Sequence, residues 1–235
     1  MRNTIFAIIG LSGSGKSTIA RYLASHYDIP NISPIAPLKA FIEEVNGLEP
    51  GELETLESKS KHPKRLPFGN LGGVSCDYSY QDTLVNLYHF WEEHDPDFGA
   101  KMLRNQLWDH AYRLFLGQDY SDRRNEHLTI QSIRNITEVE VIIDFCEETA
   151  TRLVVFNVSG RKEQQLSSDV AFYELESRIL EVGASFAIIN DYSDGLYEDI
   201  NEAMYSLLKE DKERLRVDDL VENSSLVLAF GGGDN

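Results

Sequence analysis

The sequence predicts a three-layer α/β fold, in which helices cover both faces of a central parallel sheet. Short apolar runs of strand length alternate along the chain with longer segments whose apolar residues recur at helical spacing. Such alternation is typical of right-handed βαβ units. The 235 residues are enough for one domain of this kind with a full core.

The elements follow one another in a regular order, with two interruptions. Strands are predicted over 4–9, 127–131, 153–158 and 186–189, and helices over 16–26, 38–45, 81–93, 97–116, 136–148, 170–181 and 196–208. The stretch 46–80 is rich in Gly, Pro, Ser and Lys and is too long for an ordinary connection. The stretch 211–235 contains the apolar run 226–230 and suits either an extra edge strand or a partner-binding tail. We therefore expect one domain over 1–210, interrupted by an irregular insertion at 46–80, and a C-terminal extension over 211–235.

The composition excludes several classes of protein. The chain carries 39 acidic and 22 basic residues, a formal net charge of −17, which disfavours binding to nucleic acid or to anionic membranes. The two cysteines, Cys76 and Cys146, cannot form a disulfide framework or a four-ligand zinc site, which favours a reducing compartment. No apolar run approaches the ~20 residues of a membrane span. We expect a cytoplasmic protein with no membrane partner.

The most specific motif follows the first predicted strand. Residues 10–17, Gly-Leu-Ser-Gly-Ser-Gly-Lys-Ser, match the pattern G-x-x-x-x-G-K-[ST] between a strand and a helix, a context that disfavours a chance Gly-Ser turn. Glycines let successive backbone N–H groups turn towards a phosphate, Lys16 reaches the β and γ phosphates, and the Ser17 hydroxyl ligates Mg²⁺. The loop predicts a nucleoside triphosphate site. Its predicted ligands are Gly10, Ser12, Gly13, Ser14, Gly15, Lys16, Ser17 and Thr18, with Ser17 also the metal ligand.

Other nucleotide-binding classes fit less well. The base-reading tetrapeptide Asn-Lys-x-Asp of GTPases is absent from the sequence. The run Val141-Ile-Ile-Asp144 imitates the carboxylate at a strand end that holds Mg²⁺ in motor ATPases. It lies within a stretch of helical periodicity, however, so we interpret Asp144 as a solvated helix residue. A kinase of small molecules remains the class that the pattern favours.

Six further segments carry a resemblance to a known family. They are Ala36-Pro-Leu-Lys39, residues 46–53, Asp95-Pro-Asp-Phe98, Ser132-Ile-Arg134-Asn135 with Glu138, Val158-Ser-Gly-Arg161, and 189–195. In order and spacing, from Thr4 to about Lys209, the chain resembles the P-loop nucleoside-monophosphate kinases, most of all the bacteriophage deoxynucleoside monophosphate kinases. The resemblance implies a three-layer P-loop kinase fold with a helical acceptor-binding insertion. It also implies ATP and Mg²⁺ as cofactors, and transfer of the γ-phosphoryl group to a (deoxy)nucleoside monophosphate.

The resemblance also implies roles for individual residues. Lys16, Arg134 and Arg161 would be catalytic, and Asn190 and Asp191 would contact the adenine or the ribose. The acceptor would be bound by Lys39, Asp97, Arg104, Ser132 and Glu138. The expected partner is a small-molecule nucleotide, and a homodimer is left open. A basic cluster, Lys59, Lys61, Lys64 and Arg65, could screen the charge of a phosphorylated substrate.

Two departures from the family leave alternatives open. Ser132 stands where the family has an aspartate, and Gln81 where it has an arginine. One alternative keeps the kinase chemistry but uses a hydroxyl acceptor, on a hydroxymethylated base in DNA or on dephospho-coenzyme A, with Asp97 or Glu138 as the base. Another is a nucleotide-binding protein whose activity has decayed. Plainer interpretations of single residues also remain, such as a surface salt bridge for Arg134 and a helix start for Asp95-Pro96.

Overall fold

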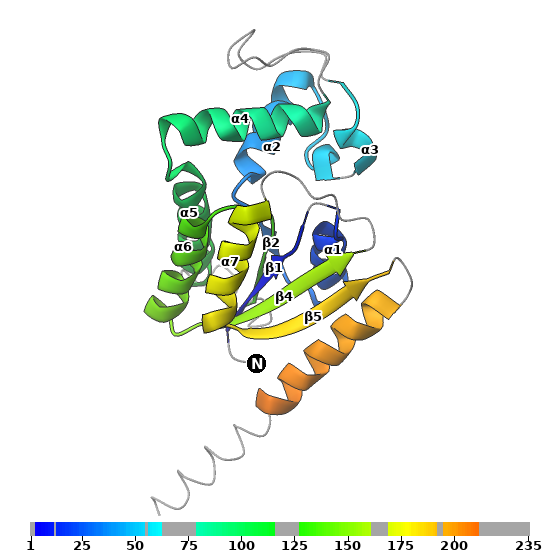
Figure 1. Cartoon of the computed structure of the whole chain (residues 1–235), viewed down its shortest axis with the longest axis vertical. Coiled ribbons are helices and arrows are strands. Elements are labelled where there is room, and N and C mark those ends of the chain that lie inside the picture. Colours follow the sequence, from blue (N-terminus) through cyan, green and yellow to red (C-terminus); the bar gives the residue numbers. More distant parts are fainter. Residues whose placement is uncertain are drawn as a thin grey trace, which may run out of the picture.

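The chain folds around a parallel five-stranded sheet with a helical lobe above one edge (Figure 1). The computed structural model describes residues 3–11, 13–54, 56–62, 79–115, 127–160, 169–191 and 195–211. Ser12, Arg161, the cations Lys64 and Arg65, and nearly all of the 211–235 extension therefore lie outside the described residues. No described helix combines the length and apolarity needed to cross a membrane.

The sheet is entirely parallel, as predicted. Its strands are β1 (Thr4–Ile9), β2 (Asn31–Ile32), β3 (Leu128–Ile130), β4 (Arg152–Gly160) and β5 (Ala184–Asn190), in the spatial order β2-β3-β1-β4-β5. All six residues of β1 are buried, because this strand is central and both of its faces are covered. The order brings the carboxyl ends of β3, β1 and β4 side by side, which is where open α/β sheets bind their ligands.

Two apolar clusters sandwich the sheet, since alternate residues of β1 point to opposite faces. Ile5, Ala7 and Ile9 pack with α5 (Phe98–Phe115), α6 (Ile136–Glu148) and α7 (Asp169–Val182). Phe6 and Ile8 pack with α1 (Lys16–Tyr27) and the helix over 195–211. The fold is thus the predicted three-layer arrangement.

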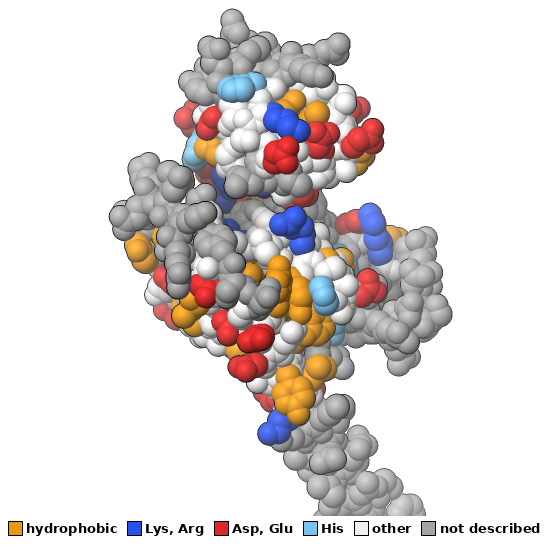
Figure 2. Space-filling view, turned by 90° about the vertical axis from the view of Figure 1, so that its right-hand side faces the viewer, with side chains coloured by type: hydrophobic (Ala, Val, Ile, Leu, Met, Phe, Trp, Pro, Cys, Tyr) orange, Lys and Arg blue, Asp and Glu red, His pale blue; other side chains and the backbone are white. Residues whose placement is uncertain are grey.

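A third cluster holds together a lobe that we call the arm, residues 36–62 and 80–94. It consists of α2 (Ala36–Asn46), a 3₁₀ turn η1 (Glu52–Glu54), the short α3 (Leu56–Lys59) and α4 (Tyr80–His94). Leu38, Ile42, Leu53, Leu84 and Leu87 are among its buried residues. The arm stands over the carboxyl edge of the sheet (Figure 1), and Figure 2 shows Lys and Arg side chains on either side of its junction with the sheet body.

The structure contains three short elements that were not predicted, and the other elements differ from the predicted ones mainly at their ends. β2, η1 and α3 were not predicted, because runs of two to four residues carry no usable periodicity. α5 begins at Phe98 rather than at Asp97, since Asp95 ends α4 and its carboxylate accepts the Asp97 N–H at 3.3 Å. Asp144 lies in α6 with its side chain 56% exposed, which confirms its interpretation as a solvated helix residue.

Candidate active site

The loop after β1 has the backbone geometry that its glycines predict. Gly10, Gly13 and Gly15 have φ values of 146°, 81° and 105°, where side-chain-bearing residues are strained. Space is restricted as well: a Cβ on Gly10 would overlap the carbonyl oxygen of Val158, and a Cβ on Gly15 would overlap the side-chain amide of Asn190. The glycines therefore serve both the curl of the loop and its close fit against β4 and β5.

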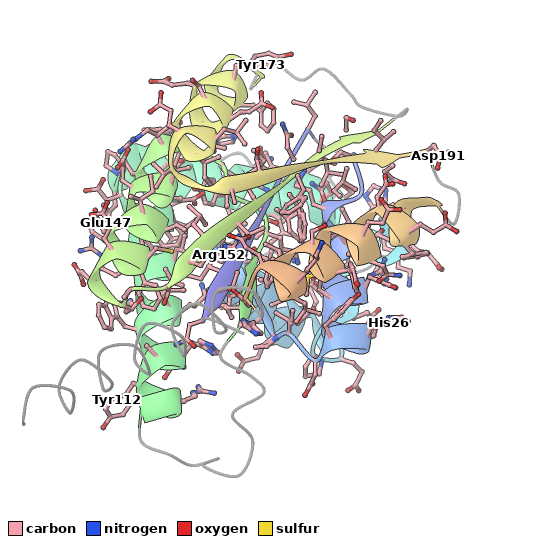
Figure 3. The ribbon with its side chains drawn as sticks, turned by 90° about the horizontal axis from the view of Figure 1, so that it is seen from below. His26, Tyr112, Glu147, Arg152, Tyr173 and Asp191 are labelled. Atoms are coloured by element: carbon pink, nitrogen blue, oxygen red, sulfur yellow. The ribbon has the colours of Figure 1, made fainter. Side chains whose placement is uncertain are left out.

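The ends of β4 and β5 brace this loop. The Nδ2 atom of Asn190 donates to the Ser14 carbonyl at 2.8 Å, and the Asn190 residue is 3% exposed. A Cβ on Gly160 would lie 3.0 Å from the Ser14 Cα, so the end of β4 also runs directly along the loop. The Asn190 side chain thus holds the loop backbone, a different role from the predicted contact with adenine or ribose. Arg152 begins β4 at the amino end of the parallel sheet, and Asp191 directly follows β5 at the opposite, carboxyl end (Figure 3).

Lys16 and the first turn of α1 complete the loop. The Lys16 Nζ lies 2.6 Å from the Gly10 carbonyl oxygen and 2.7 Å from that of Leu11, so the ammonium group folds back across the loop. The Ser14 hydroxyl is buried and has no hydrogen-bond partner among the described residues. Ser17 and Thr18 follow in the first turn of α1, whose N-terminus adds partial positive charge. These features fit the phosphates of a nucleoside triphosphate.

The described residues contain no preformed metal site with several protein ligands. Among them, no group of three or more His, Cys, Asp or Glu side chains is placed to hold one. Mg²⁺ in nucleotide enzymes is bound largely by phosphate oxygens and water, with one or two protein ligands. The donor set here therefore suits an ion that arrives with the nucleotide, with the Ser17 hydroxyl as the predicted protein ligand.

Positive charge gathers between the arm and the sheet body. Lys59 of α3 interacts electrostatically with Lys39 of α2, Arg134 after β3 and Arg21 of α1, and with the carboxylate of Glu54. Burial and then the charges of Lys39, Arg134 and Arg21 lower the pKa of Lys59, while Glu54 opposes this shift. We call Lys39, Lys59, Arg134 and Arg21 the cation cluster. An anion placed among them would relieve their mutual repulsion.

A buried carboxylate in the arm shapes this cluster. Glu43 is 6% exposed and accepts the backbone N–H groups of Gly51 at 3.0 Å and Leu53 at 2.8 Å. It thereby fixes the turn between α2 and α3, and so the position of Glu54. The Lys39 Nζ, on a side chain that is only 4% exposed, lies 2.7 Å from the Glu54 Oε1. The predicted acceptor residue Lys39 is therefore at the junction, paired with a carboxylate of its own lobe.

Arg134 lies in the loop that follows β3. Ser132 has a φ of 64°, a left-handed conformation that is uncommon for serine and is often found at functional sites. The Arg134 guanidinium carbon lies 5.0 Å from the ring centre of Tyr88 of α4, within cation–π distance. Its backbone N–H donates to the Glu138 Oε2 at 2.6 Å. Arg134 is thus held at the sheet edge by contacts with both the arm and α6.

Glu138 is a buried structural carboxylate. It is 0% exposed and accepts the Tyr88 hydroxyl at 2.8 Å, and its backbone N–H donates to the side chain of Asn135, the N-cap of α6. Burial raises the pKa of Glu138, and the donors Arg134 N–H and Tyr88 hydroxyl oppose that shift. The prediction of a substrate ligand or base is not supported by this position, because the carboxylate faces the protein interior. The Asn-x-x-Glu spacing of a capping box is the sequence signal for this role.

The structure brings some predicted acceptor residues to the junction and leaves others elsewhere. Arg104 lies on α5 and approaches Asp144 of α6 at 3.9 Å, both side chains being more than half exposed. Asp144 is more than two turns from the start of α6, so Arg104 is displaced from the site. Asp97 is exposed just before α5, and Gln81 is half-buried in the first turn of α4. Ser132 lies beside Arg134 at the end of β3.

Three features identify the fold: the parallel sheet of order β2-β3-β1-β4-β5, the glycine loop after β1, and the helices on both faces. It is a three-layer α/β fold with a glycine-rich loop after its central strand. No family model and no curated protein matches the chain.

Two solved structures are similar to the chain at low sequence identity. One, from Chloroflexus aurantiacus J-10-fl, is assigned as a kinase; it is 16% identical with a TM-score of 0.40, over 92% of this chain and 98% of its own. The other, an unliganded sugar kinase from Janibacter sp. HTCC2649, is 13% identical with a TM-score of 0.38, over 88% and 95%. The function therefore has to be inferred from the site.

Proposed function

We propose that the protein transfers the γ-phosphoryl group of ATP to the phosphate of a (deoxy)nucleoside monophosphate, giving ADP and the nucleoside diphosphate. The observation that carries the proposal is the cation cluster at the junction of the arm and the sheet body. Lys39, Lys59, Arg134 and Arg21 come from four elements that are distant in the sequence, in a chain whose net charge is −17. Such a concentration of cations beside a phosphate-binding loop suits a second phosphorylated ligand.

The chemistry asked of these residues is positioning and neutralisation of charge. The loop N–H groups and Lys16 would hold the β and γ phosphates, and Ser17 would ligate the Mg²⁺ that accompanies them. Arg134 would stabilise the charge that spreads over the transferring phosphoryl group, together with Arg161 outside the described residues. An acceptor phosphate is already an anion, so the reaction needs no general base. Lys39 and Lys59 would bind that acceptor phosphate.

A hydroxyl acceptor receives less support. It requires a base, and the two candidates are poorly placed: Glu138 is 0% exposed with donors on both oxygens, and Asp97 is exposed just before α5. Duplex DNA also binds through several Lys or Arg contacts along its backbone, whereas the cation cluster lies around one point of the junction. We therefore favour a small phosphorylated acceptor.

Release of ADP from ATP tests the proposal. The purified chain is incubated with ATP and Mg²⁺, alone and with each of the common ribo- and deoxynucleoside monophosphates, the matching nucleosides, dephospho-coenzyme A, and DNA containing hydroxymethyluracil. We expect at least one monophosphate to stimulate ADP release and its nucleoside to be inert at the same concentration. Stimulation by the DNA or by dephospho-coenzyme A alone would favour the hydroxyl-acceptor alternative. Tight binding of ATP with no turnover under any condition would favour a decayed nucleotide-binding protein.

A further inference from the structure

Contacts between α4 of the arm and the loop after β3 connect the arm to Arg134. The ring of Tyr88 lies beneath the Arg134 guanidinium at 5.0 Å, and its hydroxyl donates to the Glu138 Oε1 at 2.8 Å. Asn135 donates from Nδ2 to the Tyr88 hydroxyl oxygen at 3.1 Å and to the Glu92 Oε1 at 2.9 Å. Tyr88 thus contacts both the charged end of Arg134 and the carboxylate that holds its backbone.

The packing leaves these groups little freedom. Tyr88 is 1% exposed and Glu138 is 0% exposed. On the third side stands Gly99 of α5, where a Cβ would overlap both the Glu138 Oε1 and the Tyr88 hydroxyl. Burial and the neighbouring Glu138 raise the pKa of Tyr88, so its hydroxyl keeps its proton and remains a donor. The buried hydroxyl and carboxylate are therefore both hydrogen-bonded in this packed arrangement.

We propose that Tyr88 is a positioning residue for phosphoryl transfer: it places Arg134 through its ring and its hydroxyl, so that the position of the arm sets the position of the catalytic arginine. The inference rests on the proposed function, in which Arg134 stabilises the transferring phosphoryl group. A displacement of about 1 Å in such a group is enough to lower a rate ~100-fold. The left-handed backbone of Ser132, two residues before Arg134, needs surrounding contacts to be maintained.

Two substitutions separate the two contacts of Tyr88. Tyr88→Phe keeps the ring and removes the hydroxyl, and Tyr88→Leu removes both while remaining apolar. We expect kcat to fall by ~3- to 10-fold in the first and by ~30- to 100-fold in the second, with the KM for ATP within about twofold of the wild type. Leu87→Ala is the matched control, because Leu87 is the neighbouring buried residue of α4 in the arm core. It should leave the kcat of the folded enzyme unchanged.

A double-mutant cycle distinguishes positioning from general loss of structure. If Tyr88 acts through Arg134, Tyr88→Leu should not lower kcat further in an Arg134→Ala background. Additive losses in kcat, or a loss in Leu87→Ala equal to that in Tyr88→Leu, would overturn the inference. A wild type that is inert with every acceptor, or an Arg134→Ala variant with unchanged kcat, would instead contradict the proposed function.

Amide hydrogen exchange tests the positioning claim independently of turnover. In the protein without ligands, amide exchange in a peptide covering 131–138 should be faster in Tyr88→Leu than in wild type. At matched stability, Leu87→Ala should increase the exchange rate of this peptide less than Tyr88→Leu does. Tyr88→Phe, which keeps the ring in the core, should show a smaller increase in the same peptide. Unchanged exchange over 131–138 in both Tyr88 variants would overturn the inference, whatever the enzyme assays show.

Discussion

The two halves of the candidate site are built in different ways. The nucleotide half is made of backbone: glycines with positive φ, the N-terminus of α1, and the braces from Gly160 and Asn190. The acceptor half is made of charged side chains from several elements, of which Lys39 and Lys59 belong to the arm and Arg134 to the sheet edge. Backbone groups present the same donors to every nucleotide, whereas side chains that meet between two lobes can differ from one acceptor to another.

The largest expected effect comes from the nucleotide half. Lys16→Ala should lower phosphoryl transfer by at least ~1000-fold, because the ammonium group neutralises charge on the transferring phosphates. It should leave the melting temperature nearly unchanged, since Lys16 does not pack in a core. Steady-state ADP release and a thermal melt measure the two quantities. Turnover close to the wild-type value would show that this loop is not the catalytic site.

A smaller effect is expected in the acceptor half. Lys59→Met should raise the KM for the acceptor by ~10- to 100-fold, the loss of one charge-assisted hydrogen bond, and leave the KM for ATP within about twofold. Lys61→Met is the control, because Lys61 follows α3 with its side chain 55% exposed and pairs loosely with Glu52 at 4.0 Å. Equal effects of the two substitutions on the acceptor KM would indicate that Lys59, like Lys61, is a solvated surface lysine.

A substitution at Asn190 should change the KM for ATP rather than the KM for the acceptor. Asn190→Ala removes the 2.8 Å hydrogen bond to the Ser14 carbonyl and should raise the KM for ATP by ~5- to 10-fold, with the acceptor KM unchanged. Asn201→Ala offers a matched control, since Asn201 accepts hydrogen bonds from Tyr22 and Tyr27 of α1 rather than bonding the loop. A rise confined to the acceptor KM would contradict the division of the site into two halves.

The smallest expected effect is on stability, away from both halves. His127 lies just before β3, its buried Nδ1 atom has no hydrogen-bond partner in the part of the chain that the structure describes, and burial lowers its pKa from 6.5 to about 4. Because the folded pKa is the lower one, the unfolded chain binds more protons between pH 6.5 and 4. The free energy of unfolding should therefore fall as the pH is lowered through that window. The slope should be below the ~1.4 kcal/mol per pH unit of a single proton, since solvent screens part of the effect.

Denaturant titrations at pH 7.5 and 5.5 measure this loss of stability. The difference in the free energy of unfolding between pH 7.5 and pH 5.5 should be smaller in His127→Gln, because glutamine does not titrate. The ATP and acceptor KM values of that variant at pH 7.5 should match those of the wild type, since His127 is at the opposite end of β3 from Arg134. If the variant loses as much unfolding free energy between pH 7.5 and pH 5.5 as the wild type does, His127 is not the source of the loss.

The same contrast explains what the sequence could predict. The nucleotide loop requires glycine, lysine and serine at fixed spacing in one continuous segment, so a motif reveals it. The sheet and most helices follow from local periodicity, and α6 was predicted with its observed bounds. The acceptor half depends on the electrostatic interaction of Lys59 with Arg134, which are distant in the chain and have no shared pattern.

Three residues show why side-chain roles were harder to predict. Tyr88 falls at an apolar position of a helix, so its spacing indicates only a core residue, and its contact with Arg134 is a property of the tertiary structure. Glu138 was predicted as a substrate ligand, yet its spacing from Asn135 equally fits the helix cap that the structure shows. Asn190 was predicted to contact the adenine or the ribose, whereas in the structure its amide donates to the loop backbone at Ser14.

The fate of the γ-phosphoryl group tests the central claim most directly. ATP labelled at the γ-phosphate is incubated with the enzyme, Mg²⁺ and the monophosphate that most stimulates ADP release, and the products are separated by chromatography. We expect the label to move to the corresponding nucleoside diphosphate in wild type and to be absent from it in Lys16→Ala. Label recovered only as inorganic phosphate, or on hydroxymethyluracil-containing DNA while every monophosphate stays unlabelled, would contradict a nucleoside-monophosphate acceptor.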